Sequence, residues 1–161
     1  MNLVIEFARK FGAEIEIDKK FVFRNEDKLF LLNDKLVEFV KTDFIYAGIY
    51  LGKIKDGQFF PSFNLLKIIA EKKEANKVLV DKKSEWLFIC GRDVFKRGIT
   101  KVFGSVTRGS YVLVLNKNNE CLGFGEIVKD LGTIKKGVAV KNILDVGDFL
   151  RREKAKQANP L

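Results

Sequence analysis

Two clusters of basic side chains in the second half of the chain have the types and spacing that bind phosphate. The first cluster lies within residues 91–111 and the second within residues 151–156, each opposed by a single acid, Asp93 or Glu153. Arg and Lys donate hydrogen bonds to phosphate oxygens, and the planar fork of Arg donates two at once. The residues predicted to contact a phosphate-bearing partner are Arg92, Lys96, Arg97, Lys101, Arg151, Arg152, Lys154 and Lys156. Arg108 also belongs to the first cluster.

The charge of the chain is concentrated in the half that carries these clusters. Residues 1–75 hold 13 Lys/Arg and 12 Asp/Glu, whereas residues 76–161 hold 17 and 9, so the formal net charge of +9 comes almost entirely from the second half. A basic half attracts phosphate in nucleic acid or on an anionic membrane. The membrane alternative is disfavoured, because no apolar run approaches the ~20 residues of a spanning helix and the last predicted helix is too short to lie in an interface.

The amino-acid composition excludes several kinds of catalytic site and a structural zinc site. The chain has no His and only Cys90 and Cys121 as thiols, so it has no Ser-His or Cys-His nucleophile pair and lacks the four Cys or His ligands of a structural zinc site. Carboxylate catalysis stays open, but we expect a protein that is not an enzyme and that binds no cofactor or metal. The N-terminus has charged residues inside its apolar pattern, which is unlike a signal peptide and predicts a location inside the cell.

The first half is predicted to be an α+β domain, with an antiparallel sheet and flanking helices over residues 1–75. Helical spacing of apolar residues predicts helices at 2–11 and 34–40 and from Ser62 onward, with Asn33 or Asp34 as a cap. Alternation predicts strands at 13–18, 21–24, 28–32, 44–54 and 59–60. The polar stretch 71–77 is the predicted domain boundary.

The second half, residues 76–161, is predicted to be a small β barrel with short helices. Short apolar runs predict strands at 78–80, 99–103, 111–115, 121–128 and 138–140. Gly91 and Gly98 bracket one or two predicted helical turns, which would place Arg92 and Lys96 on one face. A final helix is predicted at 146–154 with Asp145 as its cap. Gly123 and Gly125 fall inside a predicted strand, where we expect close strand packing rather than a phosphate-binding loop.

Three groups of residues in the second half resemble the PUA domain, a small RNA-binding pseudobarrel named after pseudouridine synthases and archaeosine transglycosylases. They are Gly91, Val94, Lys96, Gly98 and Ile99; Leu122-Gly123-Phe124-Gly125; and Asp145-Val146-Gly147-Asp148-Phe149. The segment Gly48-Ile49-Tyr50-Leu51-Gly52-Lys53 and the helix from Ser62 extend the likeness. Residues 20–154 as a whole resemble the Nip-seven family of ribosome-biogenesis proteins, in which an α/β domain precedes PUA.

This resemblance implies a non-catalytic RNA-binding factor for large ribosomal subunit assembly and pre-rRNA processing. It implies RNA contacts on the last helix and the first basic cluster, and leaves the near-neutral first half to hold ribosome-assembly proteins. An archaeal, cytoplasmic and monomeric member is expected; eukaryotic members of the family work in the nucleolus. Two other readings stay open: an RNA-holding subunit of an RNA-modification enzyme, and a protein-interaction scaffold whose charge serves solubility.

Overall fold

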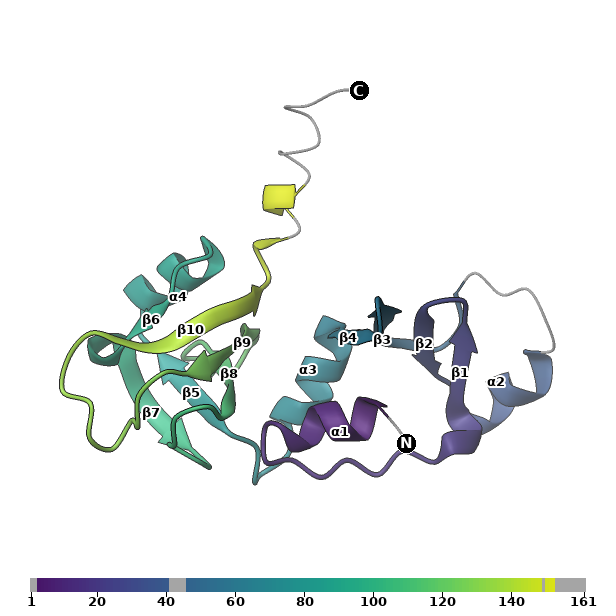
Figure 1. The fold of residues 1–161 in the computed structure, drawn as a ribbon. Coiled ribbons are helices and arrows are strands. Elements are labelled where there is room, and N and C mark those ends of the chain that lie inside the picture. Colours follow the sequence, from purple (N-terminus) through teal and green to yellow (C-terminus); the bar gives the residue numbers. More distant parts are fainter. Residues whose placement is uncertain (1–2, 41–45, 149, 153–161) are drawn as a thin grey trace. The chain divides into compact units, whose positions relative to one another are not determined.

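The computed structural model describes residues 3–40, 46–148 and 150–152. The chain divides into two compact units, Met1–Lys73 and Glu74–Leu161, each built on a sheet of its own (Figure 1). Together they form an α+β protein, as the sequence predicts.

The first unit is a four-stranded antiparallel sheet with short helices. Its strands lie in the order β1-β2-β3-β4. The bounds are β1 Val22–Asn25, β2 Lys28–Leu31, β3 Ile49–Lys55 and β4 Gln58–Pro61, with helices α1 Leu3–Arg9, α2 Asp34–Phe39 and α3 Phe63–Ala70. The three predicted helices and the predicted strands from residue 21 onward are therefore confirmed, although β3 begins later than predicted and residues 44 and 45 lie outside the described residues.

Local signals explain where these elements begin and turn. The Asn33 side chain accepts a hydrogen bond from the Leu36 amide at 2.9 Å, and Ser62 Oγ accepts one from the Leu65 amide at 3.2 Å, so each caps the helix that follows. Asp56 and Gly57 take the left-handed conformation, with φ of 51° and 74°, in the turn between β3 and β4. Helix α3 then packs on β3 and buries three apolar side chains, Leu65, Leu66 and Ile69.

The predicted strand at residues 13–18 is wrong. Ala13 and Ile15 are buried while Glu14 and Glu16 are exposed, so the alternation of faces is real. Among the described residues, however, this segment joins no β ladder and is extended chain. Alternation of apolar and polar residues shows which side chains face the core. A β-strand must in addition form backbone hydrogen bonds with a neighbouring strand.

The second unit is a curled six-stranded sheet with a short helix against it, the barrel-like fold that the sequence predicts (Figure 1). The strand order is β6-β10-β9-β8-β5-β7, and all neighbours are antiparallel except β5 and β8. The bounds are β5 Lys77–Val80, α4 Lys82–Ile89, β6 Val94–Phe95, β7 Ile99–Phe103, β8 Tyr111–Leu115, β9 Cys121–Ile127 and β10 Val138–Asp145. The inward faces of these strands meet Phe88 of α4 in one apolar core.

The helical turns predicted for residues 91–98 are wrong, because the glycine signal belongs to the helix before them. The Asp81 side chain starts α4 by accepting a hydrogen bond from the Ser84 amide at 2.7 Å, which lowers the pKa of Asp81. Gly91, at φ 86°, ends α4: the Gly91 amide bonds Phe88 O and the Arg92 amide bonds Leu87 O. Extended chain follows, with a 3-10 turn only at Lys96–Gly98, so Arg92 and Lys96 do not share a helix face.

Glycines let β9 and β10 approach closely, as expected from the sequence. A Cβ on Gly123 would lie 2.0 Å from Leu144 O, and a Cβ on Gly125 would lie 2.2 Å from Lys141 O. Gly123 also has a φ of 144°, which disfavours other residues. Strand β10 extends well beyond the predicted 138–140 and ends at Asp145, and the helical residues after it are 148 and 150–152.

We predict that Gly123→Ala lowers the free energy of unfolding of the second unit by about 2 kcal/mol, because the added Cβ meets the β10 backbone. Chemical denaturation followed by fluorescence measures this, since Trp86 is the only tryptophan and lies in the second unit. Gly132→Ala is the matched control: its Cβ would meet nothing within 4 Å and should change stability by less than about 0.5 kcal/mol. Equal loss in both variants would contradict the close-approach argument.

Candidate nucleic-acid interface

Segment 91–103 presents three basic side chains to solvent. Arg92 follows the glycine that ends α4, Arg97 lies in the 3-10 turn, and Lys101 lies on β7; all three are exposed. The one acid of this segment, Asp93, is half-buried and accepts a hydrogen bond from the Asn142 amide at 2.9 Å. Its carboxylate is thus committed to β10, which leaves the three cations to face solvent.

Two of these cations lie against aromatic rings. The Arg97 guanidinium carbon lies 5.8 Å from the centre of the Phe95 ring, and Lys101 Nζ lies 4.8 Å from that of Phe103. Phe95 is 43% exposed, whereas the sequence could not tell which aromatic residues face solvent. An exposed ring beside a cation is the combination on which proteins stack the bases of single-stranded nucleic acid.

A hollow opens next to this ring. Phe95 and Arg97 line it together with Ser84 and Leu87 of α4. Two acids and a lysine also line it: Asp81, whose carboxylate caps α4, Asp93, which accepts from the Asn142 amide, and Lys83. The arrangement offers an apolar wall, an aromatic face and a guanidinium within one recess.

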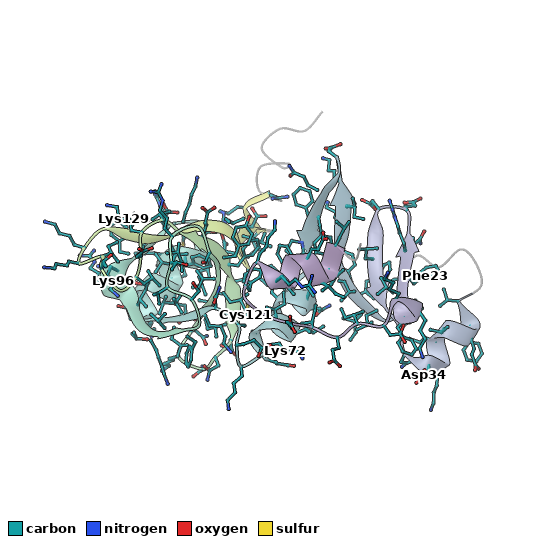
Figure 2. The ribbon with its side chains drawn as sticks, turned by 60° about the horizontal axis from the view of Figure 1, so that its bottom comes forward. Phe23, Asp34, Lys72, Lys96, Cys121 and Lys129 are labelled. Atoms are coloured by element: carbon teal, nitrogen blue, oxygen red, sulfur yellow. The ribbon has the colours of Figure 1, made fainter. Side chains whose placement is uncertain are left out.

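Lys96 differs from its neighbours in the segment. Its side chain is half-buried, and its Nζ donates a hydrogen bond to Leu131 O at 2.9 Å (Figure 2). The backbone amide of Lys96 also bonds Gly137 O at 2.9 Å. Lys96 therefore connects segment 91–103 to the loop between β9 and β10.

Arg151, in the turn after β10, has its guanidinium held by the protein itself. It donates to the Asp145 carboxylate at 2.7 and 3.0 Å and to Ile89 O at 2.6 Å. The Asp145 side chain is 3% exposed, and it also accepts from the Gly147 amide at 2.9 Å and from Asn142 at 3.1 Å. The hydrogen bond with Asp145 raises the pKa of Arg151 above its ordinary value.

This pair brings the two predicted clusters together. The guanidinium of Arg151 lies 3.2 Å from where a Cβ of Gly91 would stand, so the turn after β10 lies against the start of segment 91–103. Arg152 is exposed and pairs with Asp148 at 2.8 Å on the surface. Lys154 and Lys156 lie outside the described residues, and their predicted phosphate contacts stay predictions, as do those of the other residues named from the sequence.

A second cluster of basic residues was not recognised from the sequence. Arg108, counted with the first cluster, lies apart from segment 91–103 in a hollow that Lys129, Lys135 and Lys136 also line. Lys129, Lys135 and Lys136 lie in a Lys-rich stretch between two predicted strands. Nothing in the sequence shows that this stretch faces Arg108. Within the described ranges no group of three acidic, Cys or His side chains could hold a metal ion, and no helix there is long and apolar enough to cross a bilayer.

Comparison with known families identifies the fold of the second unit. Residues 76–154 match the family model described as the UPF0113 PUA domain. The second unit has the PUA-domain fold. A PUA domain implies RNA binding, which agrees with the chemistry of the exposed cations and ring. The PUA resemblance seen in the sequence is thereby confirmed.

Archaeal proteins are among the relatives of this chain. A UPF0113 protein of Archaeoglobus fulgidus is 29% identical over 115 residues, which cover 68% of this chain and 63% of that protein. The match therefore spans somewhat less than two thirds of the curated relative.

Solved structures show the same fold. A PUA domain from Aeropyrum pernix K1, solved as a tartrate complex, is 28% identical with a TM-score of 0.51, covering 60% of this chain and 57% of that one. A conserved PUA domain protein from Thermoplasma acidophilum is 22% identical with a TM-score of 0.59, covering 93% and 91%. The second likeness is one of fold alone, and it includes the first unit as well as the PUA domain.

We predict that Arg151→Ala destabilises the PUA domain by about 2 kcal/mol, because it leaves the buried Asp145 carboxylate without its charged donor. Arg152→Ala is the matched control, since its ion pair is exposed and contributes less than about 1 kcal/mol. Denaturation followed by Trp86 fluorescence compares the two. If the two variants unfold at the same denaturant concentration, Arg151 has no structural role.

Proposed function

We propose that this protein is a non-catalytic RNA-binding factor in large ribosomal subunit assembly and pre-rRNA processing. The observation that carries the proposal is the set of exposed cations Arg92, Arg97 and Lys101 in one segment, with Arg97 beside the exposed Phe95 ring, on a domain of the PUA fold. Cations supply phosphate contacts, and the ring supplies a stacking face that tolerates any base. We also propose phosphate contacts for Arg152, Lys154 and Lys156 of the C-terminal run.

The assembly role rests on the resemblance to the Nip-seven family, which covers both halves of the chain. The first unit is nearly neutral, and several of its large apolar side chains are exposed: Phe39 at 72%, Tyr46 at 60% and Ile49 at 44%. Exposed apolar side chains of this size are typical of surfaces that contact other proteins. We therefore assign ribosome-assembly proteins to this unit and RNA to the PUA domain. The match to an archaeal relative supports an archaeal member, and we propose that it acts as a monomer in the cytoplasm.

RNA binding by the proposed surface is tested by fluorescence anisotropy with a labelled single-stranded RNA of about 15 nucleotides, long enough for one small domain. In the triple variant Arg92→Ala, Arg97→Ala, Lys101→Ala we expect the log–log salt slope to flatten by about 2, since each lost phosphate contact removes about 0.7. Phe95→Ala should lower affinity about tenfold or more and leave the slope unchanged, because stacking releases no counterions.

The charge-matched control changes Lys19, Lys35 and Lys55, which are exposed residues of the first unit, to Ala. It should keep the wild-type slope. A triple variant that binds like this control would place the RNA contacts elsewhere. Wild-type protein without RNA affinity at low salt would overturn the proposed function.

The biological role is tested by crosslinking the protein to RNA in cells that contain it and sequencing the RNA recovered. We expect precursor and large-subunit rRNA to dominate, and the triple variant to lose that enrichment. Recovery of mature tRNA instead would favour an RNA-holding subunit of a modification enzyme. Recovery of no RNA above background would favour the scaffold reading.

A further inference from the structure

Two loops of the PUA domain enclose a hollow with a strongly positive lining. The loops are residues 104–110, between β7 and β8, and residues 128–137, between β9 and β10. We name the basic hollow by its four cationic residues, Arg108, Lys129, Lys135 and Lys136. All four are exposed, and they come from segments separated by about twenty residues of chain.

The lining of the basic hollow keeps a net positive charge, because it has four cations and one acid. In the described part of the chain, none of the four cations forms an ion pair with a carboxylate. The one acid in the lining, Asp130, accepts a hydrogen bond from the Arg108 amide at 2.6 Å, so its carboxylate ties the two loops together. Four like charges held close together repel one another, and binding an anion relieves that repulsion.

The backbone around the basic hollow is fixed before any ligand arrives. The Leu131 amide bonds Val106 O at 2.8 Å, and the Leu131 side chain is 3% exposed within the core. On the other loop, the Ser105 amide donates to the buried Asn76 side chain at 2.6 Å. Because the loops are already ordered, binding there requires little further loss of conformational entropy.

The hollow borders the candidate nucleic-acid interface. Lys96, in segment 91–103, donates from its Nζ to Leu131 O at 2.9 Å, so the 128–137 loop lies directly beside that segment. Figure 2 labels Lys96 and Lys129 within the PUA domain. A strand of RNA that leaves the Phe95 ring past Lys96 would meet the basic hollow next.

We propose that the basic hollow is a second anchoring site for the RNA backbone, where the four cations bind successive phosphates. This inference rests on the proposed function and extends its surface beyond the residues named from the sequence. The three Lys side chains can bind phosphate as point charges, and Arg108 can donate two hydrogen bonds to it at once. The lining offers no aromatic ring for a base, so the hollow contributes affinity and leaves base stacking to Phe95.

The test compares a hollow variant with a charge-matched control in the same single-stranded RNA anisotropy assay. The hollow variant carries Arg108→Gln, Lys129→Gln, Lys135→Gln and Lys136→Gln, and the control carries Gln at the exposed first-unit positions Lys19, Lys35, Lys55 and Lys67. We expect the hollow variant to flatten the salt slope by up to about 3, at about 0.7 per contact, and the control to keep the wild-type slope. The Arg108→Gln change retains the backbone amide that bonds Asp130, so Trp86 denaturation curves should show both variants folded.

Amide NMR of the wild-type protein titrated with this RNA gives a second readout. Gly109 and Gly132 report on the basic hollow, whereas Gly91 and Gly98 report on segment 91–103. Shifts in both sets support the inference. Shifts confined to Gly91 and Gly98, with a hollow variant that binds like its control, overturn the second anchoring site and leave the proposed function standing. No shift in either set, with no measurable affinity, overturns both.

Discussion

Strand β10 crosses β9 so closely that the chain has no room for a side chain at Gly123 or Gly125. Backbone carbonyls of Leu144 and Lys141 occupy the space where those side chains would be. Strand β10 stays paired with β9 along this contact as far as its last residue, Asp145, which pairs with Gly123. Asp145, the last residue of β10, consequently reaches the end of α4, where Arg151 bonds both its carboxylate and Ile89 O. The same strand begins where the 128–137 loop ends, so one close crossing positions both the C-terminal turn and one wall of the basic hollow.

The basic residues of the PUA domain fall into two groups, one bonded within the fold and one exposed to solvent. Arg151 and Lys96 use their donors on a buried carboxylate and on backbone carbonyls, and so connect the segments that carry the other cations. Arg92 and Arg97, and the residues of the basic hollow, point their charge at solvent and are available to phosphate. A high net positive charge alone therefore does not define an RNA-binding surface. Which cations contribute depends on which of them already have partners within the fold.

The two units differ in the surface that each offers. The PUA domain presents unpaired cations and an exposed ring, whereas the first unit is near neutral and presents large apolar side chains such as Phe39 and Tyr46. Charge attracts RNA over a range set by ionic strength, while apolar surface stabilises contact with a protein only after encounter. A protein with one surface of each kind is suited to hold an RNA segment and a protein partner together.

Features that depend on neighbouring residues could be predicted from the sequence. The helix capped by Asn33 or Asp34, the helix from Ser62, the close strand packing at Gly123 and the PUA resemblance could all be predicted, because each depends on short stretches of adjacent residues. Other features needed the tertiary structure. Gly91 is the same residue whether it ends one helix or begins another, and only the bonds to Leu87 and Phe88 decide. Likewise, Arg108 lies beside residues 129–136, and Arg151 bonds Ile89 O, only because the curled sheet brings distant segments together. Local conformation follows from local chemistry, whereas the contacts that make a cation structural or available arise from packing between segments far apart in the chain.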